Sequence, residues 1–357
     1  MPTSAPEPHS PWRRAIGIGV ALAALVTIVV LAFAWPSVTS APKGVPIAVA
    51  GPDAAVGRFE TALRQQAGDA FDVHPVAGRT AAVRAIERRA DYGAILLGDR
   101  PAVLTSSAAS PIVAQQLAAI APVLQAQLQK AVAAQLPAGA PVPAISVEVA
   151  DVVPLAEADA RGTGLIAAAL PLVIGGLIGG VALTIALVGS VRRLAALAVY
   201  AVVGGIALTS VLQGWFGVLQ GSFPLNASIF TLALLGIGAP IIGFAALVGR
   251  IGVAIGPATF LLIANPISAA AQPLEFLPAP WGAVGQWFPP GAAATLLRDA
   301  SYFPHADTTF PWLVLAGWAA AGALLGLVGH FRQTGGATAE AIHEAERAEV
   351  SEPAVAA

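Results

Sequence analysis

Charged residues are unevenly spaced along the chain, and the long gaps between them predict membrane-spanning helices. An uncharged apolar helix of about 20 residues is long enough to cross the hydrocarbon core of a bilayer. Stretches of this kind, without Asp, Glu, Lys or Arg, occupy residues 15–35, 162–191, 194–249, 251–274 and 310–331. The third stretch is too long for one helix, and the turn residues and interfacial aromatics of Gln213–Pro224 divide it in two. The sequence therefore predicts six spans, with Asn265-Pro266 ending or breaking the fifth helix.

The basic residues fix the expected orientation, because Lys and Arg near span ends stay preferentially in the cytoplasm. With six spans and a cytoplasmic amino terminus, the arginines at the span ends fall on the cytoplasmic side: Arg13, Arg14, Arg192, Arg193, Arg250 and Arg332. Among the later outer loops, Arg298 is the exception. We therefore expect a multi-pass protein of the plasma membrane, with lipid around its spans and both termini in the cytoplasm.

A cleaved signal peptide is the alternative for the first span, since Ala32-Phe33-Ala34 has the small-x-small form of a cleavage site. The apolar stretch, however, is longer than the core of about 7–15 residues that is usual in such a peptide. We therefore favour a retained first helix.

The segment between the first two spans has a different chemistry, with ten Lys or Arg and eleven Asp or Glu. Short strand-like stretches alternate with amphipathic ones, which is the pattern of a small α/β domain. We expect strands over 46–50, 71–76, 94–97 and 145–149, and helices over 56–67 and 80–89. A longer helix is predicted from Ile112 to Leu136, bent at Pro122, with an apolar stripe that packs on its own domain or on a second subunit.

Together these patterns predict an α-helical polytopic membrane protein with an inserted extracellular α/β domain. Its parts are a cytoplasmic amino-terminal tail over 1–14, a first transmembrane helix over 15–36, the extracellular domain over 37–161, five further transmembrane helices over 162–333 with an outer re-entrant or interfacial segment at about 265–305, and a disordered cytoplasmic tail over 334–357. The tail is assigned as disordered because it is rich in Gly, Ala and Glu and ends in Pro and Ala.

Composition agrees with this class, because 57% of the residues are apolar and only 11% are charged. A soluble globular chain carries about 25% charged residues. The net charge of −2 gives no sign of nucleic-acid binding. The chain has no cysteine, which excludes disulfides, thiolate metal sites and cysteine nucleophiles.

The sequence lacks the motifs of the common enzyme classes. The only lysines, Lys43 and Lys130, do not belong to a phosphate-binding loop, the histidines lack metal-ligand spacing, and no G-x-S-x-G elbow occurs. We therefore predict no catalytic, cofactor-binding or metal-binding residue and no enzymatic activity. No Asp, Glu, Lys or Arg side chain lies inside a predicted span, which disfavours a carrier with its own proton or sodium pathway.

The second predicted span contains two overlapping G-x-x-x-G patterns, formed by Gly175, Gly176, Gly179 and Gly180. Glycines at this spacing allow two helices to approach closely. They predict either ordinary tight packing within the chain or the seam of a homodimer.

The most distinctive stretch runs from Asn265 to Phe303 and is rich in Pro, Trp and Phe. Its only charges are Glu275, Arg298 and Asp299, and Trp281 and Trp287 are suited to anchor it at the membrane interface. It is either an outer loop that rests on the lipid surface or a re-entrant gate beside a lateral path for an apolar or amphipathic substrate. For its three charges, a local ion pair is favoured over contact with substrate.

The chain resembles the permeases of type-2 ATP-binding-cassette exporters, in the actinobacterial and phage-infection-protein-like branch with a large domain after the first span. The resemblance rests on the six-span layout, on Asp151-Val152-Val153-Pro154-Leu155 with Asp159 before the second span, and on the stretch from Asn265-Pro266 to Arg298, Tyr302 and Phe303. It implies a half-transporter that depends on a separate ATPase and exports lipids, polysaccharides, drugs or peptides. The family's amphipathic amino-terminal helix and cytoplasmic coupling helix have no counterpart here, because the loop after the second span is little more than Arg192-Arg193.

The leading hypothesis is therefore the permease subunit of an ATP-driven exporter, a homodimer that moves an apolar or amphipathic substrate outward. Arg192 and Arg193 are its candidate contacts with the separate ATPase. The alternative is a non-transporting cell-envelope protein whose outer domain binds a partner, which the short cytoplasmic loops favour. A membrane enzyme that acts on lipid is the least favoured, since no catalytic cluster is visible.

Overall fold

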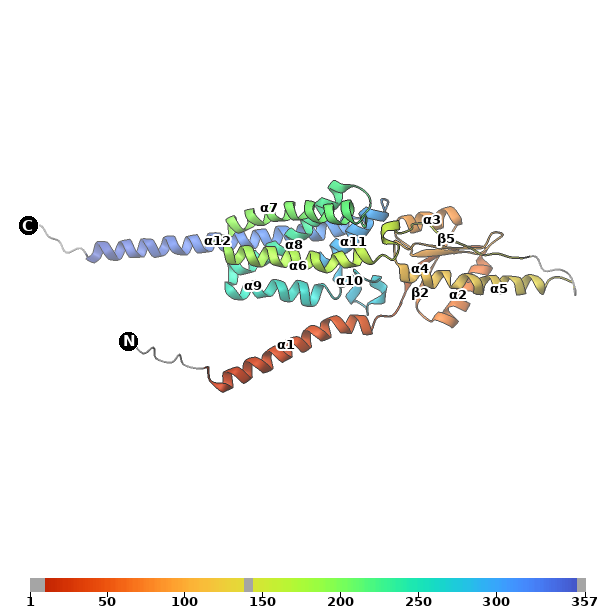
Figure 1. The fold of residues 1–357 in the computed structure, drawn as a ribbon, viewed down its shortest axis with the longest axis horizontal. Coiled ribbons are helices and arrows are strands. Elements are labelled where there is room, and N and C mark those ends of the chain that lie inside the picture. Colours follow the sequence, from red (N-terminus) through yellow and green to blue (C-terminus); the bar gives the residue numbers. More distant parts are fainter. Residues whose placement is uncertain (1–9, 138–143, 352–357) are drawn as a thin grey trace, which may run out of the picture.

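The computed structural model describes residues 10–137 and 144–351, with side chains described through Arg332. A bundle of apolar helices forms one part of an elongated molecule, and a small α/β domain lies beyond one end of it (Figure 1). We call this end of the bundle the domain end and the opposite end the far end.

Five helices of the bundle are long and apolar enough to cross a membrane, which confirms the expectation of several membrane-length helices. They are α1 (Trp12–Val38), α6 (Thr163–Ala186), α7 (Ser190–Thr209, continued by the π-helical turn η2, Ser210–Trp215), α8 (Phe223–Val248) and α12 (Thr309–Ser351). The turn expected over Gln213–Pro224 separates α7 from α8, as predicted.

The fifth expected span is shorter in the structure than the uncharged stretch 251–274. Helix α9 (Arg250–Pro257, 8 residues) continues into the π-helical turn η3 (Ala258–Ala264, 7 residues), and the helix ends at Asn265-Pro266 as expected. At about 1.5 Å per residue these residues extend roughly 22 Å, less than a hydrocarbon core of about 30 Å. Length alone therefore supports five crossings, while α9 and η3 run beside α6 and return the chain to the domain end (Figure 1).

Helix α8 is the centre of the bundle and contacts α6, α7, α9, α11 and α12. The glycines of α6 make this possible, because a Cβ atom on Gly176 would lie only 2.7 Å from the Cβ of Ile237, and one on Gly180 would lie 3.0 Å from Gly238. Gly179 lies against the ring of Tyr200 in α7, whose hydroxyl donates a hydrogen bond of 2.8 Å to the carbonyl of Gly175. The G-x-x-x-G glycines thus pack within one chain, and the structure favours this interpretation over a dimer seam.

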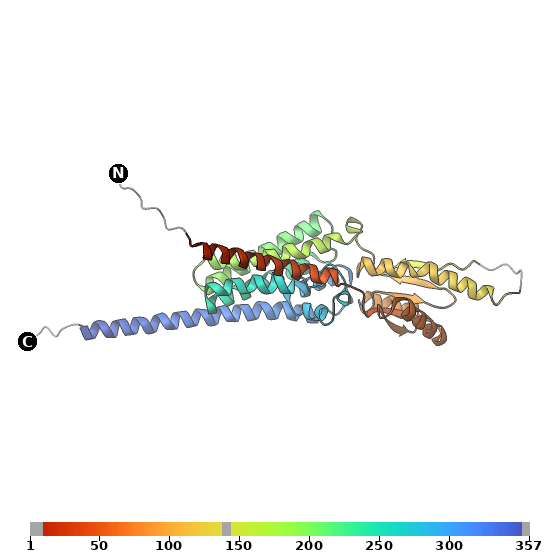
Figure 2. The ribbon, with the colours of Figure 1, turned by 90° about the horizontal axis from the view of Figure 1, so that it is seen from below.

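The carboxy-terminal tail differs from the expectation of disorder over 334–357. Helix α12 continues without interruption through Ser351 and projects beyond the far end of the bundle (Figure 2), and residues 352–357 lie outside the described residues. The physical reason is the composition of the tail, because Ala and Glu are among the strongest helix formers and the preceding span supplies the helical nucleus.

The α/β domain between α1 and α6 is built on a five-stranded sheet in the order β2-β1-β3-β4-β5. Its strands are β1 (Val45–Ala50), β2 (Phe71–Val76), β3 (Gly93–Leu96), β4 (Ala102–Thr105) and β5 (Glu148–Asp151). Strand β1 pairs in parallel with β2 and β3, β4 is antiparallel to β3, and β5 is parallel to β4. Strand β4 is not predicted from the sequence, and β5 begins three residues after the predicted start at Ile145.

Helices cover both faces of the sheet. On one face α2 (Asp53–Ala67), α4 (Pro111–Ala118) and α5 (Ile120–Ala133) pack on Ile47, Ile95 and Val103, and on the other α3 (Arg79–Glu87) packs on alternate residues such as Ala48. The helix predicted over 112–136 is broken at Ala119 rather than bent at Pro122. Pro122 falls in the first turn of α5, where a missing backbone N–H costs nothing.

Candidate functional site

The segment between η3 and α12 folds against the domain end of the bundle and contains η4 (Leu274–Phe276), α10 (Trp281–Gly285) and α11 (Pro289–Tyr302). Helix α11 is buried against α8 and α12 through Ala292, Ala293 and Leu296. This is the segment predicted to be re-entrant or interfacial, and the structure places it between the bundle and the α/β domain.

An ion pair joins this segment to the domain. The guanidinium of Arg89, just after α3, lies 2.7 Å from the carboxylate of Asp299 in α11 and 5.9 Å from the ring centre of Phe303. Only 4% of the Asp299 side chain and 19% of the Arg89 side chain are exposed. Burial raises the pKa of Asp299 above its ordinary value, against the opposing pull of Arg89 and Arg298.

Arg298 bridges the two parts through backbone carbonyls. One guanidinium nitrogen donates to the carbonyl of Ala109 in the domain at 2.6 Å, and the other donates to the carbonyl of Ala270 at 3.3 Å. Burial lowers the pKa of Arg298 to about 10, so the side chain stays charged at neutral pH. The predicted local role of Glu275, Arg298 and Asp299 therefore takes the form of contacts with the domain.

Tyr92 and Glu275 make the third polar link, since the Tyr92 hydroxyl donates to the Glu275 carboxylate at 2.9 Å. Burial and the neighbouring Glu275 raise the pKa of this phenol. Beside these groups, Phe276 and Phe303 belong to the same apolar core as Val113 of the domain. We call the contacts of Arg89 with Asp299, of Tyr92 with Glu275 and of Arg298 with the carbonyl of Ala109 the docking seam.

On the domain side of the seam, Arg89 and Tyr92 lie in a turn that is held by contacts of Asp91 with His74, which we call the braced turn. Arg89 has a left-handed backbone with φ of 57°, which non-glycine residues adopt at a cost. Asp91, two residues later, is buried and lies 2.9 Å from His74 Nδ1, while Asp72 lies 3.3 Å from Nε2. Burial lowers the pKa of His74, but hydrogen bonds and charge from Asp91 and Asp72 outweigh it and raise the pKa overall.

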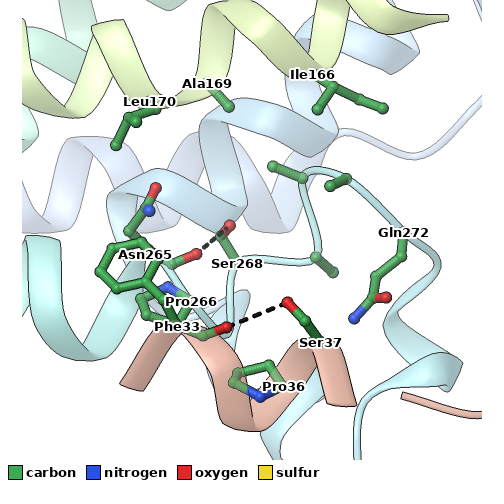
Figure 3. A pocket seen from close by; sticks show the side chains of 13 residues that line it. Phe33, Pro36, Ser37, Ile166, Ala169, Leu170, Asn265, Pro266, Ser268 and Gln272 are labelled. Carbon is green, nitrogen blue, oxygen red and sulfur yellow. Dashed lines mark hydrogen bonds between the residues drawn. The ribbon is translucent and has the colours of Figure 1, made fainter. Parts of the chain in front are cut away.

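A crevice of about 250 Å³ opens beside the seam, between α1, α6 and the chain that follows η3 (Figure 3). Its walls are Phe33, Pro36 and Ser37 of α1, Ile166, Ala169 and Leu170 of α6, and Asn265, Pro266 and Ser268–Gln272. None of these side chains is charged. The crevice therefore combines apolar helix faces with a few hydroxyl and carboxamide groups.

The crevice and the seam share structural elements. Ala270 lines the crevice, accepts the hydrogen bond from Arg298 and also lines a smaller adjoining cavity with Arg298. Gln272, at the other end of the crevice, accepts a hydrogen bond of 2.6 Å from Ser40 in the connection between α1 and the domain. A shift of the domain would therefore move the wall of the crevice that contains Ala270 and Gln272.

Helix α1 contacts the bundle near its domain end. Its Trp35 packs edge-to-face on Trp281 with ring centres 6.2 Å apart, and the N–H of Ala41 donates to the carbonyl of Phe276. Trp287, the other predicted anchor, packs on Phe310 at 4.9 Å and remains 63% exposed. Both tryptophans thus lie at the end of the bundle next to the domain, as an interfacial role requires.

Two further predicted positions have structural roles. Asp159 in the turn η1 (Glu157–Asp159) accepts hydrogen bonds from the backbone N–H of Gly164 at 2.9 Å and of Leu165 at 3.4 Å, which caps the start of α6. Arg193 donates to the carbonyl of Leu187 at 2.9 Å and so closes the end of α6. Arg192 is exposed in the first turn of α7 at the far end.

Several residues of the site escape sequence reasoning. Arg89, Tyr92, Ser40 and Gln272 lie far in sequence from their partners, and no local pattern marks them. Asn265 is visible as a polar residue at the end of an uncharged run, but its position in a crevice is not.

In the part of the chain that the structure describes, no group of three or more His, Cys, Asp or Glu side chains could hold a metal ion. No family model matches the chain, and neither the curated proteins nor the solved structures contain a significant match to it.

Proposed function

We propose that this chain is the permease subunit of an exporter that moves an amphipathic substrate outward and is powered by a separate ATPase. The observation that carries the proposal is the crevice between α1 and α6, whose walls are apolar with a few uncharged polar groups. A lateral opening of this composition suits a molecule with an apolar tail in lipid and a polar head among the hydroxyl and carboxamide groups.

In this proposal α9 and η3 act as a sixth, shortened crossing, so the α/β domain is extracellular and both termini are cytoplasmic. The start of α1 and the end of α12 lie at the far end of the bundle, away from the domain (Figure 2). A bilayer that is thinner around α9 would accommodate its short length at modest cost.

The seam provides a physical route between the domain and the crevice. Since Ala270 and Gln272 line the crevice and also bond to Arg298 and Ser40, displacement of the domain changes the crevice width. We assign the domain the role of a lever that helps release substrate on the outer side.

The far end offers little surface for an ATPase. Only Leu187–Gly189 connect α6 to α7, and only Gly249 connects α8 to α9. In the proposed arrangement the ATPase therefore contacts the first turn of α7, with Arg192 and Arg193, and the projecting end of α12.

Purification from the native host in mild detergent, followed by mass spectrometry, tests the proposal. We expect a nucleotide-binding subunit in stoichiometric amount, lost when Arg192 and Arg193 are both replaced by Ala and retained in a matched Arg13→Ala, Arg14→Ala variant. Copurification of envelope proteins alone, or of nothing, would contradict the transport proposal.

The short connections at the far end favour one competing proposal, a non-transporting envelope protein whose domain binds a partner. It predicts that envelope proteins copurify with the chain and that their recovery depends on the α/β domain. The same purification separates the two proposals.

A further inference from the structure

The crevice differs from a purely apolar gap between helices because the side-chain carboxamides of Asn265 and Gln272 have polar atoms without hydrogen-bond partners in residues 10–137 and 144–351. Among the described residues, the hydrogen bonds of Asn265 involve its backbone N–H and carbonyl, and no partner engages its side chain. The side-chain oxygen of Gln272 accepts a hydrogen bond from Ser40, and the side-chain amide nitrogen of Gln272 has no partner in the described ranges. Figure 3 shows both side chains at the border of the crevice.

The hydroxyl protons in the crevice already have acceptors. Ser37 donates to the carbonyl of Phe33 in its own helix at 3.1 Å, and Ser268 donates to the carbonyl of Asn265 at 2.7 Å. The free side-chain donors of the crevice walls therefore belong to two carboxamides, and that of Asn265 can also accept. A polar group that faces an apolar surrounding without a partner is costly, so these positions call for a polar ligand or water.

Among the described residues that line the crevice, none carries a positive charge. Arg298 lines the smaller adjoining cavity, and its two terminal nitrogens donate to the carbonyls of Ala109 and Ala270. A charged head that entered the crevice would lose hydration without gaining an opposite charge.

On the basis of the proposed function, we infer that the crevice selects an amphiphile with an uncharged, hydrogen-bonding head, such as one with hydroxyl or ester groups, and that Asn265 determines this specificity. The head lies between Asn265 and Gln272, and the tail leaves between α1 and α6 toward lipid. A volume of about 250 Å³ is suited to a small head rather than to a whole lipid.

Photolabelling in nanodiscs tests the inference with two probes that carry the same diazirine-bearing acyl chain. One is a monoacylglycerol, with a neutral head, and the other is its phosphate monoester, with an anionic head. We expect the neutral probe to label the crevice peptides about fivefold more than the anionic probe, as a hydrogen bond gained without a desolvated charge would give.

Three variants sharpen the test. Asn265→Leu is expected to reduce neutral labelling about fivefold. Thr27→Ala, which removes a hydroxyl from α1 outside the crevice lining, is the control and should leave labelling unchanged. Asn265→Lys is expected to reverse the preference toward the phosphate probe, a gain that misfolding cannot produce. Equal labelling by both probes, a preference of the unmodified protein for phosphate, or unchanged labelling in Asn265→Leu would overturn the inference.

This outcome is separable from the test of transport. Selective labelling without a copurifying ATPase would support the binding site and contradict the proposal of an exporter. A copurifying ATPase without selective labelling would remove only the inferred specificity.

Discussion

Helices α1 and α8 have nearly the same length, 27 and 26 residues, and each has a long apolar stretch, yet they occupy opposite environments. Two thirds of the most apolar part of α8 is buried, compared with none of α1. In α8, Gly236, Gly238 and Gly243 let neighbouring helices approach closely, whereas a Cβ atom on Gly17 or Gly19 in α1 would meet nothing within 4 Å. Hydropathy thus identifies both as membrane-length helices. It does not distinguish α8, which is packed on several neighbours, from α1, whose apolar part is exposed.

The crevice lies beside the point where α1 contacts the bundle, since Phe33, Pro36 and Ser37 flank Trp35. Under the proposed function, a helix packed as tightly as α8 at this position would leave no room for an amphiphile.

The largest effect is expected from a bulky side chain in the packed helix. A Cβ atom on Gly243 would meet the carbonyl of Gly322 at 2.6 Å, so Gly243→Leu must push α12 away from α8. We expect a loss of about 3 kcal/mol or more, measured as thermal stability in detergent. Gly19→Leu in α1, where nothing lies within 4 Å, is the control and should leave stability unchanged.

A smaller effect is expected at the docking seam. Arg89→Ala leaves the buried carboxylate of Asp299 without its ion-pair partner, and we expect a loss of about 1–3 kcal/mol because the pair is only partly exposed. Arg88→Ala, at an exposed neighbouring position, should have no effect. Hydrogen exchange of the turn around Tyr92 would measure the difference between the two variants. Equal exchange in both would contradict a stabilising role of the ion pair in the seam.

The attachment of α1 should depend on one aromatic pair. Trp281→Ala removes the partner of Trp35, a contact worth about 1 kcal/mol, and should broaden the distances between spin labels on α1 and α12. The absence of cysteine makes labelling at two introduced positions, Ile16 and Val328, specific. Trp287→Ala, which affects the contact with Phe310 instead, should leave the distribution unchanged.

The smallest effect is a dependence on pH in the braced turn. Since the pKa of His74 is raised in the folded protein, its contribution is complete below the unfolded value of 6.5 and is lost as pH rises through the folded value. The side chain is 48% exposed, so we expect less than about 1 kcal/mol. The protection of the Tyr92 amide, that is, the factor by which its exchange is slower than the intrinsic rate at the same pH, should fall from pH 6 to about pH 8. His74→Asn should abolish that fall, and His305→Asn should preserve it.

The sequence predicts those features that depend on local composition. Gaps between charges locate α1, α6, α7, α8 and α12, because the length of an apolar run is a property of neighbouring residues. The short strand-like runs 46–50, 71–76 and 94–97 locate β1, β2 and β3 in the domain. The anchoring of Trp281 and Trp287 at the membrane interface stays a prediction.

The seam cannot be predicted in this way. Arg89 and Asp299 are separated by 210 positions, and their contact depends on a left-handed residue at the end of α3. The carboxamide of Asn265 likewise has no partner within the described part of the chain, for two reasons. The shortened helix ends there in a π-helical turn, and α1 leaves a crevice beside it. Both depend on how distant elements pack, which composition does not encode.

The proposed outward transport requires the α/β domain to lie outside the cell, and cysteine labelling in intact cells tests this most directly. Gln65→Cys places a thiol on the exposed face of α2, and Arg192→Cys places one at the far end of the bundle. We expect a membrane-impermeant maleimide to label the first variant in intact cells and the second only after permeabilisation. Labelling of Arg192→Cys in intact cells, with Gln65→Cys protected, would put the domain in the cytoplasm and contradict outward export.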